Sequence, residues 1–188
     1  MPNASSSRRG SRLTVDDWLA AAMELLVTEG VAAIKISRLC QHLGVTKGSF
    51  YWHFADIGSL MTALAEHCRR AQESAMQTLS ELADLPPVDR IDAMSRLVTD
   101  DRRWKVEAAV RAWAATDETI AESVAALDQR VFDVAYQAMI DLGFSETEAH
   151  ARATTALYAG IGFLHGRRQH GVLADADIRI FVEMLTRR

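Results

Sequence analysis

The sequence predicts an all-α protein in which a small helix-turn-helix domain is joined by a long helix to a larger helical domain. Three observations support this prediction. Apolar residues recur at helical spacing along nearly all of the 188-residue chain, and strand-like alternation does not persist anywhere. Glycines and a Pro-Pro pair interrupt the pattern at only a few points. The 49% hydrophobic content is sufficient for a buried core without being typical of a membrane protein.

Several protein classes are excluded by composition. The chain has no apolar run of 18 residues, and its N-terminus lacks the apolar segment of a secretory signal, so we expect a cytoplasmic protein. The chain contains two cysteines, Cys40 and Cys68. Cys40 falls on the apolar face of a predicted helix, which favours two buried thiols over a disulfide.

The first predicted elements are an arm and a supporting helix. Residues 1–12 are rich in Ser, Arg and Gly without periodicity, which predicts a flexible basic arm. The segment from Thr14 to Asp17 resembles a capping box. A helix that ends at Gly30 is expected to follow. Its apolar face comprises Val15, Trp18, Leu19, Ala22, Leu25 and Leu26.

Residues 35–54 predict two short helices joined by a tight turn. The first helix has an apolar face formed by Ile36, Leu39, Cys40 and Leu43, with Ser37 expected as its N-cap. Gly44 then suits a left-handed turn residue. Thr46 is expected to cap the second helix, and Phe50 and Phe54 are expected to face inward.

The second of these helices presents small, polar and basic side chains outward. The outward residues are Lys47, Ser49, Tyr51, Trp52 and His53. Gly48 removes a side chain where a close backbone approach to DNA would need space. This set suits a DNA groove. The alternative is an ordinary helical hairpin with exposed aromatic rings.

A connecting helix and a larger helical region follow. Asp56 is expected to cap a helix that continues to about Leu82, before the Leu-Pro-Pro sequence at 85–87. Further breaks are expected near Asp100, at Thr116–Asp117, at Gly143 and at Gly171. A capping box from Ser145 to Glu148 starts a long helix to about Gln169.

Charge is distributed unevenly along the chain. The net charge is −4, but residues 1–58 carry six Lys and Arg against five Asp and Glu, whereas the remainder carries fifteen against twenty. The N-terminal part is therefore the candidate surface for a polyanion.

The segment Gly-Val-Thr-Lys-Gly-Ser-Phe-Tyr-Trp-His-Phe at 44–54 closely resembles the recognition-helix signature of the TetR family of bacterial transcriptional regulators. Residues 13–70 resemble that family's DNA-binding domain. The resemblance implies a homodimeric repressor released from a palindromic DNA operator by a small molecule, with residues 71–188 forming a ligand-binding and dimerisation domain. The sequence departs from the family pattern at Ile57, where a lysine is common.

The implied DNA contacts span the arm and both helices of the motif. They are Arg8, Arg9, Arg12, Ser37, Arg38, Thr46, Lys47, Gly48, Ser49, Tyr51, Trp52 and His53. The arm is expected either to follow phosphates or the minor groove, or to be a plain disordered tail. Trp52 is expected either to pack on the sugar-phosphate wall or to support the helix from within.

The rest of the chain predicts an effector site and a dimer interface less specifically. Candidate effector-site residues are Trp104, Arg111, Trp113, Phe132, Tyr136 and Tyr158, with core filling as the alternative. Candidate interface residues on the last two helices are Ala156, Gly160, Phe163, Arg167, Ile178, Phe181, Val182 and Leu185. An intramolecular core is the alternative for this second set.

An enzyme is not expected. No His, Cys or carboxylate residues have the spacing of a metal site, and the nucleophile, phosphate-loop and Cys-Xaa-Xaa-Cys motifs are absent. We therefore expect no metal and no cofactor. The remaining alternatives are an activator, or a helical carrier or partner-binding module that does not bind DNA.

Overall fold

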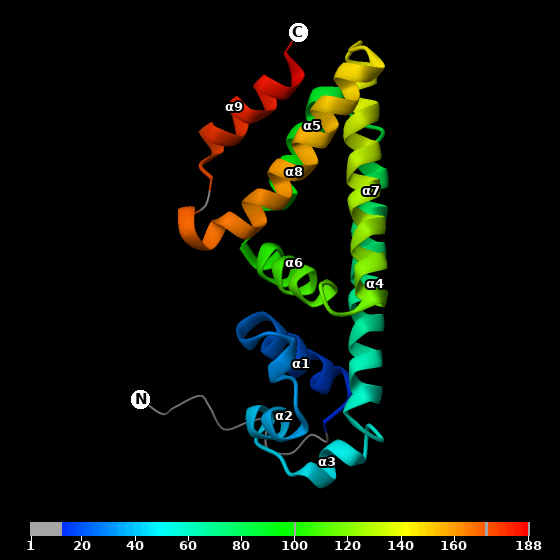
Figure 1. Cartoon of the computed structure of the whole chain (residues 1–188), viewed down its shortest axis with the longest axis vertical. Helices are drawn as coiled ribbons and strands as arrows, with labels where there is room; N and C mark the ends of the chain where they lie inside the picture. The colour runs from blue at the N-terminus through cyan, green and yellow to red at the C-terminus, as the bar shows by residue number, and fades with distance from the viewer. Residues whose placement is uncertain (1–12, 100, 172, 188) are drawn as a thin grey trace, which may run out of the picture. The chain divides into compact units, whose positions relative to one another are not determined.

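The computed structural model describes residues 13–99, 101–171 and 173–187, and it confirms the all-α prediction for these residues (Figure 1). They form α-helices and one short 3₁₀ turn, without a strand. The chain divides into two compact units, one ending at Leu64 and one starting at Ala65. This division falls within α4, which spans Ile57–Leu82.

The first unit contains α1 (Val15–Glu29), η1 (Val31–Ala33), α2 (Ile36–Leu43), α3 (Lys47–Tyr51) and the start of α4. The expected capping box is present: the Asp17 N–H donates to the Thr14 hydroxyl at 3.3 Å, and the Thr14 N–H donates to the Asp17 carboxylate at 2.8 Å. α1 ends at Gly30, as expected.

The core of this unit is built around aromatic rings. Trp18 and Phe50 are fully buried and pack edge-to-face with ring centroids 5.4 Å apart. Leu39, Leu60 and Leu64 are fully buried as well, and they complete the core. Val15 was expected on this apolar face but is exposed, because it lies at the first turn of α1, beyond the packed part of the helix.

The turn between α2 and α3 has the expected glycine geometry. Gly44 adopts the left-handed conformation, with φ 68° and ψ 33°. The expectation for Ser37 is wrong: α2 begins at Ile36, and the extended Lys35 is its N-cap residue. Ser37 therefore lies within the first turn. Thr46 occupies the N-cap position of α3 without a capping side-chain hydrogen bond.

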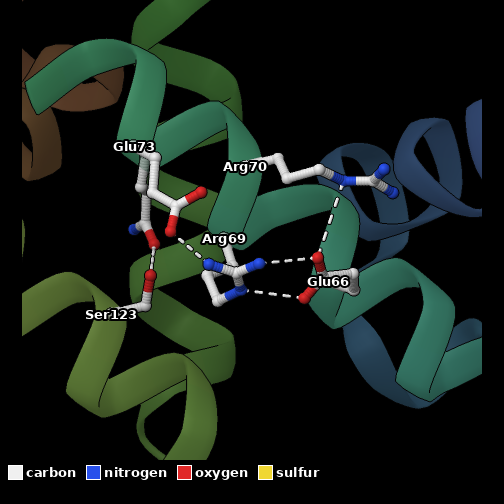
Figure 2. Close-up of polar contacts among 6 residues, drawn as sticks. Glu66, Arg69, Arg70, Glu73 and Ser123 are labelled. Atoms are coloured by element: carbon white, nitrogen blue, oxygen red, sulfur yellow. Dashed lines mark hydrogen bonds and ion pairs between the residues drawn. The ribbon is translucent and has the colours of Figure 1, made fainter. Parts of the chain in front are cut away.

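α4 begins where the sequence predicts. The Asp56 carboxylate accepts a hydrogen bond from the Ser59 N–H at 2.7 Å, which satisfies one donor of the first turn. Further along, its exposed surface carries i,i+3 and i,i+4 ion pairs, in which Arg69 bridges Glu66 and Glu73 (Figure 2). These pairs explain how so polar a stretch remains helical.

The second unit continues with α5 (Pro87–Thr99), α6 (Asp101–Ala114), α7 (Glu118–Asp141), α8 (Glu146–His170) and α9 (Asp175–Thr186). The breaks predicted at Thr116–Asp117, Gly143 and Gly171 are confirmed, and the glycines at 143 and 171 have positive φ angles of 82° and 79°. Asp100, near which another break was expected, lies outside the described residues. The capping box of Ser145 and Glu148 is present at the start of α8.

The core of the second unit lies between α5, α7, α8 and α9. Ala138 and Met139 of α7 are buried against Ala149 and Ala153 of α8, where small side chains permit close packing. A second apolar cluster joins α4 to α7 through Leu79, Leu127 and Val134. α6 packs against both α7 and α8.

Candidate nucleic-acid interface

α3 presents a polar and aromatic surface above a buried ring. Phe50 is fully buried, and the ring of Phe54 lies 5.6 Å from it. Lys47, Tyr51 and Trp52 are exposed; Ser49 and His53 are half-buried. The prediction that Lys47, Tyr51 and Trp52 face outward is thus confirmed, as is the prediction that Phe50 and Phe54 face inward. Trp52 is 70% exposed, so its ring does not support α3 from within.

Gly48 is exposed, and the fold does not need a glycine there. A Cβ atom added at this position would have the Thr46 hydroxyl oxygen as its nearest neighbour, at the ordinary contact distance of 3.7 Å. Its backbone conformation is also helical. Since packing within the chain leaves this space open, the glycine suits an external surface that approaches α3 closely.

The basic residues of α2 are already paired with acidic residues of α1. Arg38 donates to both Glu29 carboxylate oxygens, at 3.1 and 2.5 Å. His42 Nε2 lies 2.8 Å from the Glu24 carboxylate. The hydrogen bond from Arg38 holds the pKa of Glu29 below its usual range. These pairs tie α2 to α1, and no local sequence pattern indicates this role, because the partners are nine and eighteen positions apart.

The unpaired charge near α3 is therefore concentrated on lysine. Among the described residues of the first unit, Lys35 and Lys47 are the Lys or Arg side chains without an ion pair, and both are exposed. Arg8, Arg9 and Arg12 lie outside the described residues. Ile57, which stands where the family pattern has lysine, is the half-buried first residue of α4.

Residues 19–64, which contain this helix-turn-helix unit, match the model of the bacterial regulatory proteins of the tetR family. The class E tetracycline repressor protein of Escherichia coli is 34% identical over 82 residues. The N-terminal domain belongs to the TetR family. The alignment with that repressor covers 39% of each chain, so the chain matches well under half of this relative's length.

Solved structures extend the likeness in fold beyond the TetR-family domain. A transcriptional regulator from Rhodococcus sp. Rha1 has a TM-score of 0.64 at 18% identity, covering 93% of this chain and 94% of its own. AibR, solved with isovaleryl coenzyme A and operator DNA, has a TM-score of 0.66 at 22% identity, covering 92% and 97%. At these identities the comparison establishes a shared helical fold.

Two of the expected effector-site residues lie together at a surface pocket. Phe132 and Tyr136 stack on each other with ring centroids 5.9 Å apart, and they line a surface pocket of about 450 Å³ with Glu146, Thr147 and His150. The other four expected residues, Trp104, Arg111, Trp113 and Tyr158, do not line this pocket. Trp113 is buried, whereas Tyr158 is 67% exposed.

Arg111 was expected at the effector site, but two carboxylates already hold its guanidinium. Its guanidinium lies 2.5 Å from Asp128 and 2.8 Å from Glu107. A third anion would have to compete with both carboxylates. No local sequence pattern indicates this arrangement, because Asp128 comes from the next helix.

The expected dimer stripe on α9 requires a correction. Ile178, Val182 and Leu185 are buried within their own protomer, in the cluster that they share with α5, α7 and α8. Phe181 also turns inward, where its ring lies 5.8 Å from Phe163. The apolar stripe of α9 thus covers the core of the same chain, which was the alternative for these residues.

The remaining interface residues are half-buried: Ala156 packs against the same core, Gly160 has partial exposure, and Arg167 lies over the Trp104 ring. Large apolar side chains on these helices are exposed at other positions, namely Tyr158, Ile180 and Met184. Helical periodicity did not indicate Ile180 and Met184, because they lie outside the main apolar stripe of α9.

Two further findings concern the described residues alone. They contain no group of three His, Cys, Asp or Glu side chains arranged to hold a metal ion. None of their helices is long and apolar enough to span a membrane.

Proposed function

We propose that the protein is a DNA-binding transcriptional regulator: a homodimeric repressor that leaves a palindromic operator when a small molecule binds its second unit. The exposed surface of α3 above buried Phe50 is the observation that carries this proposal. A lysine, a tyrosine, a tryptophan and an open glycine position lie together there, as an element that enters a major groove requires.

Individual contacts follow from this placement. Thr46, Lys47, Tyr51 and His53 hold the DNA backbone, and Lys47 and Ser49 lie nearest the base edges. Trp52 packs against the sugar-phosphate wall, in keeping with its exposure. Ser37 and Arg38 contact phosphate at the start of α2, and the arm with Arg8, Arg9 and Arg12 adds sequence-independent affinity. Arg38 does so while remaining oriented by Glu29.

The homodimer forms through the exposed surface of α8 and α9 that carries Tyr158, Ile180 and Met184. Ile180 and Met184 are four residues apart and share one face of α9, and exposed large apolar side chains are typical of an interface. A twofold axis through this surface would provide the second recognition helix, the α3 of the partner copy, that a palindromic operator requires.

The dimer has two states, which differ in the distance between its two recognition helices. The effector shifts the population from one state to the other. AibR, a structural relative, was solved with both an acyl coenzyme A and operator DNA, and this supports the pairing of a small-molecule site with DNA binding in this fold. The proposed protein is a cytoplasmic regulator rather than an enzyme, and it needs no cofactor.

The test is a gel-shift titration of the full-length protein against the intergenic DNA that flanks its own gene, at several salt concentrations. We expect specific binding that weakens as salt rises. Binding to none of these regions would favour the alternative of a helical carrier without DNA binding.

A lysine variant locates the binding surface. Lys47→Ala should weaken binding by about 1 kcal/mol or more and reduce the salt dependence, because a phosphate contact is lost. Lys105→Ala, which removes an exposed lysine from the second unit, is the matched control and should bind normally. Equal binding by the Lys47 variant and the wild type would exclude Lys47 from the interface.

A further inference from the structure

The helix-turn-helix segment from Lys35 to Phe54 has an unbalanced charge. It contains three Lys or Arg residues and no Asp or Glu, so any carboxylate that neutralises one of these cations comes from another part of the fold. The three cations differ in whether such a carboxylate is present. This difference separates the cations that are free to meet an external polyanion from the one that is not.

Arg38 is neutralised within the protein. Its Nε and Nη2 atoms donate to the two carboxylate oxygens of Glu29, at 3.1 and 2.5 Å. The two side chains are 35% and 38% exposed, so the pair is partly withdrawn from water. Because the pair has no net charge, a phosphate that contacts it releases few counterions. The Nη1 group takes no part in the pair with Glu29 and is the group that donates to such a phosphate.

Lys35, in contrast, keeps its charge. It is the exposed residue directly before α2, with an extended backbone at φ −131° and ψ 148°. It has no ion pair among the described residues, and the two α1 carboxylates that face α2 are occupied by Arg38 and His42. Its ammonium is therefore a hydrated point charge without a protein counterion, which is the kind of cation that exchanges its counterions for a phosphate.

Lys35 lies at the end of α2 that is remote from α3. α2 has eight residues and leads into the turn before α3 (Figure 1). Eight helical residues extend about 12 Å, and the major groove of B-DNA is also about 12 Å wide. When α3 lies in the groove, the start of α2 therefore reaches the phosphate backbone at the edge of the groove, where the first helix of this motif crosses it.

We infer that Lys35 binds a backbone phosphate of the operator and provides the net positive charge of the α2 contact. Arg38 contributes hydrogen bonds without net charge. Lys35 is not among the DNA contacts that the family resemblance implies, so the inference extends the interface to the residue before α2. It rests on the proposed DNA-binding function.

The test measures the salt dependence of DNA binding by the full-length protein. Fluorescence anisotropy gives its affinity for an intergenic duplex that flanks its own gene and for an unrelated duplex of equal length. Lys35→Gln should make the slope of log affinity against log salt concentration less steep by about 0.9 per protomer, or about 1.8 for a dimer. Because a phosphate carries no sequence information, the affinity for both duplexes should fall by the same factor.

Three control variants separate a local contact from a general change of charge. Lys105→Gln removes the same charge from an exposed site of the second unit and should leave the slope unchanged. Lys35→Arg keeps the charge and should keep the slope. The double variant Glu29→Gln with Arg38→Gln replaces a neutral pair by neutral side chains, so the slope should stay the same while the affinity falls with the lost hydrogen bonds.

Two results would overturn the charge assignment, provided that circular dichroism shows each variant to be folded. One is a slope that Lys35→Gln leaves unchanged. The other is a slope that becomes less steep in the double variant instead. A loss of affinity confined to the intergenic duplex would also contradict the inference, because it would assign Lys35 to base recognition.

The two duplexes separate this inference from the proposed function. Preferred binding of an intergenic duplex with a slope that does not depend on Lys35 contradicts the inference alone. Equal binding of all duplexes, with a slope that depends on Lys35, contradicts the proposed repressor and retains Lys35 as a phosphate contact. Binding to neither kind of duplex contradicts both.

Discussion

Single residues of the first unit have opposite roles according to the side of α3 that they occupy. Phe50 packs against Trp18 and holds α3 in place, whereas the side chains of Lys47 and Tyr51 are exposed to solvent. Gly48 differs from both because its contribution is the missing side chain. The buried residues of α3 thus hold the helix in position, and its exposed residues are the ones available to contact DNA.

Substitution of Gly48 should separate folding from DNA binding. Because a Cβ atom fits there, Gly48→Ala should leave the free energy of unfolding unchanged or raise it by about 0.5 kcal/mol. Gly48→Leu should weaken operator binding by more than about 1.4 kcal/mol, since the side chain occupies the space that DNA needs. Urea unfolding and fluorescence anisotropy measure the two effects. Normal operator binding by Gly48→Leu would contradict the proposed docking geometry.

Cys68 gives a pH-dependent contribution to stability. Its pKa is raised to about 11 in the folded protein from an ordinary 9.0, because burial disfavours the thiolate. The folded state therefore holds the proton more tightly, and this stabilisation is complete below pH 9 and is lost as the pH rises towards 11. The loss should approach about 2 kcal/mol.

Urea unfolding under reducing conditions at about pH 8 and about pH 10.5 tests this contribution. The wild type should lose more unfolding free energy between these two conditions than Cys68→Ala does, although the variant is less stable overall. Equal losses in the two proteins would show that Cys68 does not titrate in this range.

At the scale of elements, α9 depends on α8 for its position. Arg152 of α8 donates to the carbonyls of Met184 and Leu185 at 3.1 and 2.6 Å, which satisfies acceptors in the last turn of α9. Its guanidinium also lies 4.0 Å from the centre of the Phe144 ring. One side chain thus caps one helix and packs against the segment that begins another.

Removal of the Arg152 guanidinium should loosen α9. Arg152→Met keeps the aliphatic stem but not the hydrogen bonds, so the free energy of unfolding should fall by about 1–3 kcal/mol. Hydrogen exchange should increase in α9 more than in α7. Arg179→Met, at an exposed arginine on α9, is the matched control and should change stability little. Unchanged exchange in α9 would contradict the capping role.

At the scale of the whole molecule, the buried and the exposed face of α9 have different functions. The surface with Ile178, Val182 and Leu185 completes the protomer core. The surface with Ile180 and Met184 is left open, and Met184 is 71% exposed. A repressor that reads a palindrome needs both a stable protomer and a second copy, and the two surfaces provide these separately.

Substitutions on the two surfaces of α9 should therefore have different effects. Met184→Asp places an unpaired charge in the proposed interface, so the protein should become monomeric while remaining folded, and operator binding should fall. Val182→Ala should lower the free energy of unfolding by about 1–3 kcal/mol without changing the oligomeric state. Light scattering after size exclusion and urea unfolding distinguish these outcomes. A dimeric Met184→Asp variant would place the interface elsewhere.

Local signals determined most of the fold. The helices, including the recognition helix α3, were identified from the capping boxes at Thr14 and Ser145, the turn at Gly44 and the helical periodicity. Each of these signals depends on residues within about four positions of one another. The cap of α2 was misplaced because serine is a preferred N-cap residue, whereas the helix begins at Ile36 and has Lys35 at its cap position.

Only the tertiary structure decided which surface each helix buries and which charges are paired. Sequence periodicity finds the apolar stripe of α9 but not whether it meets its own chain or a second copy, since burial removes the same apolar area from water in both cases. Arg38 and Arg111 appear as free cations in the sequence, yet Glu29 and Asp128 hold them across helix–helix contacts. Such partners are distant along the chain, and the fold alone brings them within hydrogen-bonding distance.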